Sequence, residues 1–137
     1  MIIFTPNTVI KSADVNLNYD ELKTKTDYLS APDSNWIAPT FTNSWTNYDL
    51  VYNQCGYYKD AFGFVHLRGL VRNGSDGTSI FTLPSGYRPQ YQELMAVSSA
   101  DHYGRVDIAT TGTVVPSATT TEPTWVCLDG IIFKAYA

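Results

Sequence analysis

Two loops of this sequence hold the side chains best suited to binding a ligand. The residues are Asp101, His102, Tyr103 and Arg105 in and after the first loop, and Trp45 and Tyr48 in the second. Aromatic rings cover the apolar C–H face of a sugar, while carboxylate, imidazole and guanidinium groups hydrogen-bond to its hydroxyls. Both loops therefore predict a saccharide site. Each also has a second interpretation, as ordinary loop and strand-edge packing.

No catalytic arrangement is recognisable beside these candidates. A zinc site needs three or four ligands at characteristic spacings, and the two histidines, His66 and His102, do not provide one. There is no Gly-x-Ser-x-Gly turn and no glycine-rich phosphate loop. The acidic residues of the later sequence lie mostly in turns, as Asp76 and Asp129 do, which does not suit paired-carboxylate glycoside hydrolysis. We expect a protein that is not an enzyme and that binds no cofactor or metal.

Charge and hydropathy limit the partners. The formal net charge is −4, and no run of basic residues is present, so we expect no binding to nucleic acid. No stretch approaches the roughly 18 apolar residues of a membrane span, so we expect no membrane insertion. Residues 1–6 are apolar but lack the basic start and cleavage site of a signal peptide. The sequence thus predicts a protein made and kept in a cytosol.

Two cysteines, Cys55 and Cys127, lie far apart in the chain. Reducing compartments keep thiols free, which favours two small buried hydrophobic residues. A disulfide between them is the alternative that the sequence leaves open.

One segment near the N-terminus has helical spacing. Its stripe consists of Val15, Tyr19, Leu22, Thr26 and Leu29. Asn18 and Glu21 match a capping box, and Pro32 marks the stop. A helix this short is marginal alone, so it must either pack on its own β domain or bundle with copies of itself. We therefore divide the chain into an arm and short helix for oligomerisation or attachment, residues 1–34, and a β domain, residues 35–137.

The rest of the chain predicts strands. The expected strands are 48–53, 56–60, 61–72, 78–83, 93–99, 105–109, 110–116, 125–128 and 131–136. Short alternating segments with frequent turn residues indicate a mostly-β fold, an antiparallel β-sandwich of jelly-roll type. Residues 61–72 carry apolar side chains on both faces and are expected at the centre of a sheet. Residues 73–77 should turn the chain back into 78–83, and Asp129-Gly130 should join the last two strands as a hairpin.

The segment Leu83-Pro84-Ser85-Gly86-Tyr87-Arg88-Pro89 predicts a rigid corner between strands. Pro84 has no N–H and ends strand pairing, while Gly86 can adopt the positive φ of a sharp turn. Pro89 holds Arg88 extended. We interpret this corner as structural, with direct contact to a ligand as the alternative.

This corner resembles the LPxGYRP connection of head domains in phage tail fibres and baseplate receptor-binding proteins. Three further stretches match the family in the same order: Val65-His66-Leu67-Arg68-Gly69, Gly104-Arg105-Val106-Asp107-Ile108 and Trp125-Val126-Cys127-Leu128-Asp129-Gly130. The likeness spans residues 36–136. It implies a β-sandwich head, usually a homotrimer, at the distal end of a tail and commonly binding host-surface saccharides or cell-wall polymers.

Two functions follow as hypotheses from this resemblance. The first is a tail or baseplate component of the virion, assembled in the host cytoplasm with other tail proteins, that binds a host-surface saccharide. The second is a purely structural or accessory virion protein with the same fold and no ligand. The fold alone does not decide between them.

Overall fold

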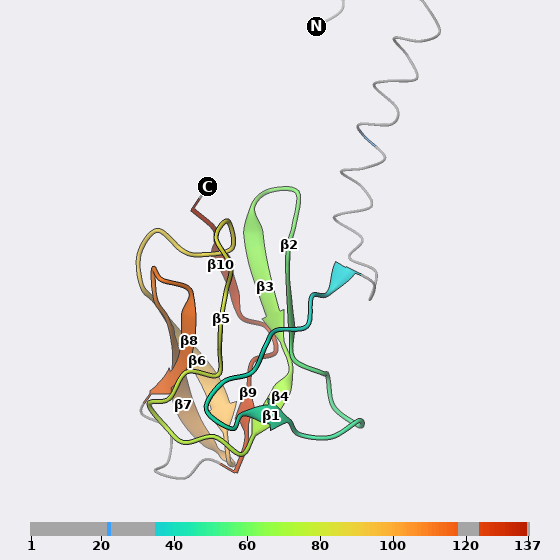
Figure 1. Cartoon of the computed structure of the whole chain (residues 1–137), viewed down its shortest axis with the longest axis vertical. Helices are drawn as coiled ribbons and strands as arrows, with labels where there is room; N and C mark the ends of the chain where they lie inside the picture. Colours follow the sequence, from blue (N-terminus) through green and yellow to red (C-terminus); the bar gives the residue numbers. More distant parts are fainter. Residues whose placement is uncertain (1–21, 23–34, 118–123, 137) are drawn as a thin grey trace, which may run out of the picture.

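The computed structural model describes residues 22, 35–117 and 124–136. The strands are β1 (Thr46–Asn47), β2 (Gly56–Lys59), β3 (Phe64–Arg68), β4 (Leu70–Arg72), β5 (Phe81–Thr82), β6 (Glu93–Ser99), β7 (His102–Ile108), β8 (Thr113–Ser117), β9 (Val126–Cys127) and β10 (Ile132–Lys134). They form a seven-stranded sheet, β1-β4-β9-β6-β7-β8-β5, and a three-stranded sheet, β10-β3-β2 (Figure 1). All strand pairs are antiparallel, so the predicted mostly-β, sandwich-like fold is confirmed.

The predicted N-terminal helix falls on residues that the structure largely leaves out. Leu22 is described and is helical, but the remainder of residues 1–34 lies outside the described residues. The division of the chain at residue 34 therefore stays a prediction.

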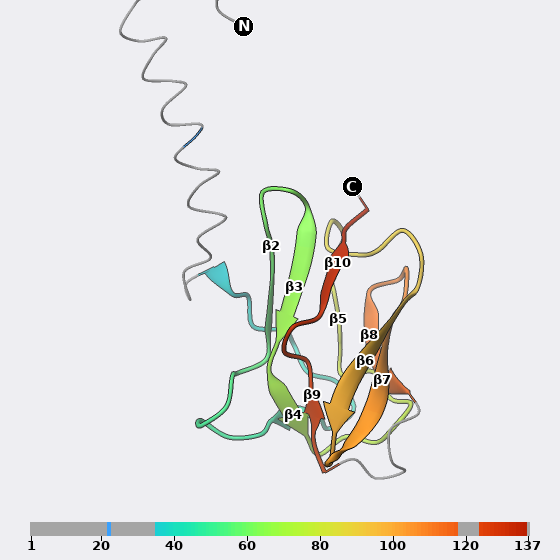
Figure 2. The ribbon, with the colours of Figure 1, turned by 180° about the vertical axis from the view of Figure 1, so that it is seen from behind.

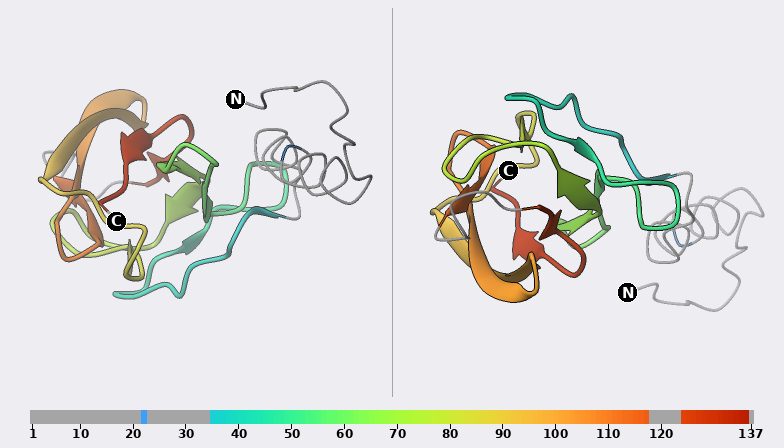
Figure 3. Two further views of the ribbon diagram at one scale, coloured as in Figure 1. Left: turned by 90° about the horizontal axis from the view of Figure 1, so that it is seen from above. Right: turned by 90° about the horizontal axis from the view of Figure 1, so that it is seen from below.

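Two neighbouring segments carry the chain from one sheet to the other. One segment is β3 followed by β4, interrupted at Gly69, and the other is β9 followed by β10 (Figure 2). Leu70 pairs with Cys127, whereas His66 pairs with Ile132. Three residues, 67–69, separate these pairs on the first segment, and four residues, 128–131, separate them on the second. The extra residue on the second segment makes a bulge. Figure 3 shows β2–β3 and β6–β7 on opposite sides of the β9–β10 segment.

The expected hairpin at Asp129-Gly130 is therefore wrong. Its turn is real, since Gly130 has a φ of 84°, but the chain then continues alongside β3 instead of folding back on β9. The Asp129 carboxylate accepts a hydrogen bond from the Gly69 N–H at 2.8 Å, in the middle of the bulge. An Asp-Gly pair supplies the same backbone chemistry to a bulge as to a hairpin, so the pair alone does not tell them apart.

Several expected strands are shorter or differently paired. Residues 61–72 split at Gly69, whose φ is 122°, although β3 does lie at the centre of its sheet as predicted. The return strand shrinks to β5, which pairs with β8 and not with β4. Residues 48–53 form no strand, because β1 ends at Asn47 and the chain then turns outward. The β2 and β6 strands match their predicted positions to within one residue.

The core lies between the two sheets. Its fully buried side chains include Val65, Leu67, Val71, Ile80, Phe81, Leu83, Val106, Ile108, Val114, Val126 and Leu128. Trp45 joins them at 1% exposure, with its indole N–H donating to the Thr78 hydroxyl at 3.1 Å. Gly74 makes room for this ring, because a Cβ at Gly74 would lie 1.9 Å from Trp45 Cε2. Packing against Trp45 thus explains a glycine that the sequence suggested for turn geometry.

The Pro-Gly-Pro corner is built into the fold. The Tyr87 ring packs edge-on against Tyr57, with ring centroids 5.2 Å apart, and the Lys59 ammonium lies 5.1 Å from its centroid. Arg88 Nε donates to the Leu83 carbonyl at 2.9 Å. Gly86 takes the expected positive φ, at 88°. These contacts agree with the structural interpretation of the corner.

Candidate functional site

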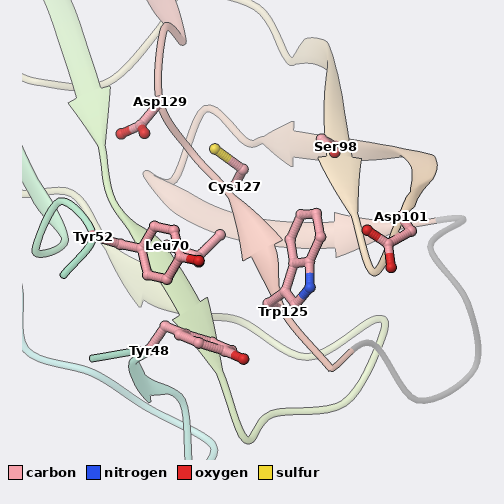
Figure 4. A pocket seen from close by; sticks show the side chains of 8 residues that line it. All are labelled: Tyr48, Tyr52, Leu70, Ser98, Asp101, Trp125, Cys127 and Asp129. Atoms are coloured by element: carbon pink, nitrogen blue, oxygen red, sulfur yellow. The ribbon is translucent and has the colours of Figure 1, made fainter. Parts of the chain in front are cut away.

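A pocket of about 370 Å³ opens where β4, β9 and the β6–β7 turn meet the loop after β1 (Figure 4). Its lining consists of Tyr48, Tyr52, Leu70, Ser98, Asp101, Trp125, Cys127 and Asp129. The volume falls in the range of sites for small molecules, and the lining combines aromatic surface with a few polar groups. The described residues thus provide a cavity with the composition expected of a saccharide site.

The two tyrosines come from the loop after β1. Their rings meet edge to face, with centroids 5.5 Å apart, and the Arg72 guanidinium lies 4.9 Å from the Tyr48 centroid. The Tyr48 N–H donates to the Leu70 carbonyl at 2.9 Å, which ties the start of the loop to β4. Tyr48 is therefore held by contacts on its backbone and its ring, whereas Tyr52 is half exposed.

Trp125 is the largest side chain of the pocket and stands directly before β9. Its carbonyl accepts hydrogen bonds from the Ala100 N–H at 3.2 Å and the Ser99 hydroxyl at 3.1 Å. These bonds attach Trp125 to the β6–β7 turn through its backbone, so the indole is not needed for them. In Figure 4 the indole stands between the tyrosine pair and Asp101.

The β6–β7 connection is tighter than expected. The predicted loop 100–104 is a two-residue turn, and His102 and Tyr103 belong to β7. Ala100 and Asp101 have φ values of 45° and 64°, which is the geometry of a type I′ hairpin turn. This turn aims Asp101 at the pocket, and it places an alanine where asparagine or glycine is usual.

Replacing Ala100 with asparagine should stabilise the domain by about 0.5–1 kcal/mol, because asparagine tolerates a positive φ better than alanine does. Urea unfolding of Ala100→Asn, compared with the original chain, measures the change. Ala96→Asn, in the middle of β6, is the matched control and should destabilise the domain. A loss of stability in Ala100→Asn would contradict the assignment of this turn.

The structure brings together two of the six predicted binding residues. Asp101 and Tyr48 both line the pocket, although they come from different loops of the sequence. Tyr103, 95% exposed, pairs with Ser98 beside the pocket but does not line it. His102 stands at the start of β7, also outside the lining.

The other two predicted residues have structural partners. Arg105 donates from Nε to Asp107 Oδ1 at 2.6 Å and from Nη2 to the Ser117 hydroxyl at 3.0 Å. The hydrogen bonds to Asp107, and next the charge of Asp107, raise the pKa of Arg105. The prediction that Trp45 binds a ligand is wrong, because its ring is buried in the core and presents no face to a ligand. Sequence reasoning missed Tyr52, Ser98, Trp125 and Asp129, of which Trp125 looked like an ordinary strand residue.

Among the described residues, two carboxylates and no basic side chain line the pocket. Asp129 Oδ1 accepts hydrogen bonds from the Gly69 N–H at 2.8 Å and from Asn53 Nδ2 at 3.2 Å. Burial raises the pKa of the Cys127 thiol. A hydrogen bond with the Asp129 backbone opposes this rise, while the charge of Asp129 and the hydrogen bond with its side chain add to it. The pocket therefore has a negative electrostatic character.

Both cysteines are free thiols, which settles the alternative left open by the sequence. Cys55 is buried behind Gly69, and burial, followed by the charge of Asp129, raises its pKa from 9.0 to about 12. The folded protein therefore keeps a proton that the unfolded chain releases above pH 9.0.

Stability should consequently fall as pH rises from about 9 towards about 12, with a slope of about 1.4 kcal/mol per pH unit from Cys55. Below pH 9.0 the stability that the protonated Cys55 thiol contributes is fully present. Urea unfolding at several alkaline pH values checks the trend, and Cys55→Ala should flatten it. An unchanged slope in Cys55→Ala would contradict the assignment to this thiol.

His66 is a satisfied structural histidine, in line with its place in an alternating strand. Its Nε2 lies 2.8 Å from Asp60 Oδ2, and its ring stacks on Tyr58 at 4.5 Å. Burial opposes ionisation of Asp60, but hydrogen bonds from His66 and from the Phe64 and Phe62 N–H groups lower its pKa overall. The described residues contain no group of three or more potential metal ligands. Nor does any helix among them have the length and apolarity to cross a membrane.

The two-sheet architecture is shared with one solved phage receptor binding protein. Among solved structures, the chain is similar to the receptor binding protein (gp15) of Listeria phage PSA. The TM-score is 0.60 and the identity 16%, over 96% of this chain and 83% of that one. At this identity the similarity shows a shared fold. No family model and no curated protein matches the sequence.

Proposed function

We propose that this chain is a phage tail or baseplate component of the receptor-binding type, and that it binds a host-surface saccharide in the pocket between Tyr48 and Trp125. One observation carries the proposal. Three aromatic rings, two carboxylates and a hydroxyl converge on one cavity, in a domain with the fold of a phage receptor binding protein.

The chemistry of the pocket suits a pyranose ring. Trp125 and the tyrosine pair offer apolar faces for the C–H groups of the sugar. Asp101, Asp129 and the Ser98 hydroxyl offer acceptors for its hydroxyl groups, and Ser98 also offers a donor. This division of roles needs no metal and no reaction, consistent with our proposal of a binding module.

A binding assay on a panel of bacterial cell-wall polysaccharides tests this function. The purified full chain should bind at least one polymer saturably, and the free polymer should compete with adsorption of the parent virion. If the chain binds none of the panel and an antibody against the β domain leaves adsorption unchanged, the proposal fails. The purely structural role then replaces it.

We also propose that the chain acts as a homotrimer in the tail. The helical stripe predicted from the sequence, which includes Leu22, supports this proposal, because a narrow apolar stripe suits a bundle of identical helices. Light scattering of the full chain should give three times the chain mass, and Leu22→Asp should reduce it. A monomer under both conditions would contradict the trimer without affecting the pocket.

A further inference from the structure

We infer that the pocket selects a sugar unit that carries a positive charge, such as the protonated amine of a glucosamine without its acetyl group. This inference rests on the proposed function and specifies the ligand's charge. The cavity and its three rings make the site, and the two carboxylates set its selectivity.

The carboxylates come from separate parts of the fold. Asp101 sits in the β6–β7 turn, where no hydrogen bond from another described residue reaches its side chain. Asp129 sits in the bulge before β10. Its Oδ1 accepts hydrogen bonds from Gly69 and Asn53, and its side chain also hydrogen-bonds to the Cys127 thiol, which lines the same pocket. Both side chains can therefore contribute negative charge to a ligand in the cavity.

Neighbouring cations do not neutralise this charge directly. Arg72 lies against the ring of Tyr48 and is absent from the pocket lining. The guanidinium of Arg105 is occupied by Asp107 and Ser117. A phosphate or uronic acid in the cavity would meet two carboxylates without a basic partner, which disfavours anionic polymers.

The aromatic rings reinforce the preference. The faces of tryptophan and tyrosine attract ammonium groups, and the attraction grows when water is excluded. A protonated amine that meets the Asp101 or Asp129 carboxylate in the cavity would also gain charge-assisted hydrogen bonds. A neutral acetamide of the same sugar gains neither effect, although it keeps the ring contacts.

The test compares two soluble oligomers of equal length near pH 6, one of glucosamine and one of N-acetylglucosamine. Titration calorimetry gives both dissociation constants, and the Trp125 indole resonance reports where each oligomer binds. We expect the amine oligomer to bind at least about tenfold more tightly. The double variant Asp101→Asn/Asp129→Asn should reduce this ratio towards one.

These substitutions suit the local structure. Asparagine tolerates the positive φ of Asp101, and at Asp129 it keeps an acceptor for the Gly69 N–H. Glu93→Gln, at the far end of β6, removes a charge outside the pocket and should leave the ratio unchanged.

Three results separate the possibilities. Equal affinities, with Trp125 perturbed by both oligomers, would overturn the charge preference and leave the saccharide site intact. If Glu93→Gln lost the preference for the amine oligomer to the same extent, the overall charge of the protein would be its cause. That result would also overturn the inference. If neither oligomer nor any wall polysaccharide perturbs Trp125, the proposed function fails as well.

Discussion

Gly69→Ala is expected to destabilise the β domain by about 3–5 kcal/mol, a large share of the stability of a domain this size. The φ of 122° at Gly69 lies in a region that residues with a side chain rarely adopt. A Cβ at this position would stand 2.4 Å from Cys55 Cα and 2.7 Å from Cys55 N. Because these are backbone atoms, no rotamer change can relieve the contact. Urea unfolding measures the loss, and failure to fold would agree with it.

Gly77→Ala is the control for this substitution. Gly77 also has a positive φ, 78°, but a Cβ there meets nothing within 4 Å. Its cost should be limited to the backbone strain, about 1 kcal/mol. Equal losses at the two positions would contradict a specific role for the close approach between Gly69 and Cys55.

Trp125→Ala should weaken saccharide binding at least about tenfold, since buried aromatic anchors dominate the binding energy of many sites. The fold should survive, because the hydrogen bonds to Trp125 use its carbonyl oxygen. Equilibrium binding to the wall polysaccharide selected from the panel measures the effect, and a melting curve confirms that the variant is folded.

Tyr103→Ala provides the matched control. Tyr103 is an aromatic residue of β7, 95% exposed and outside the pocket lining. Its loss should change the affinity by no more than about twofold. A larger effect at Tyr103 than at Trp125 would move the binding surface onto the outer face of β6 and β7.

Local patterns predicted most of the fold. The expected strands coincide with β3 and β6, where one face of each strand packs on the core while the other is more exposed. The pairing of strands could not be derived the same way. The bulge at Gly69 and Asp129 depends on a register shift between segments about 60 residues apart, and turn chemistry at Asp129-Gly130 fits a hairpin equally well.

The site was only partly predictable for a related reason. Asp101 and Tyr48 were recognised as polar or aromatic residues of loops, and the fold brings them to one cavity. The sequence could not rank Trp45 against Trp125, because burial decides their roles. Trp45 fills the space above Gly74, while Trp125 lines the pocket. Long-range packing, which a single sequence does not display, distinguishes the two.

The central claim is that the pocket at Trp125 binds a host-surface saccharide, and the three tryptophans of the chain allow a direct measurement. In a ¹⁵N-labelled sample, each indole N–H gives one resonance. Titration with the wall polysaccharide that binds in the panel should shift the Trp125 resonance saturably. Trp45, buried and bonded to Thr78, and Trp36, packed against Tyr58 and Arg68, should stay unchanged. Saturable binding that leaves the Trp125 resonance in place would contradict the account.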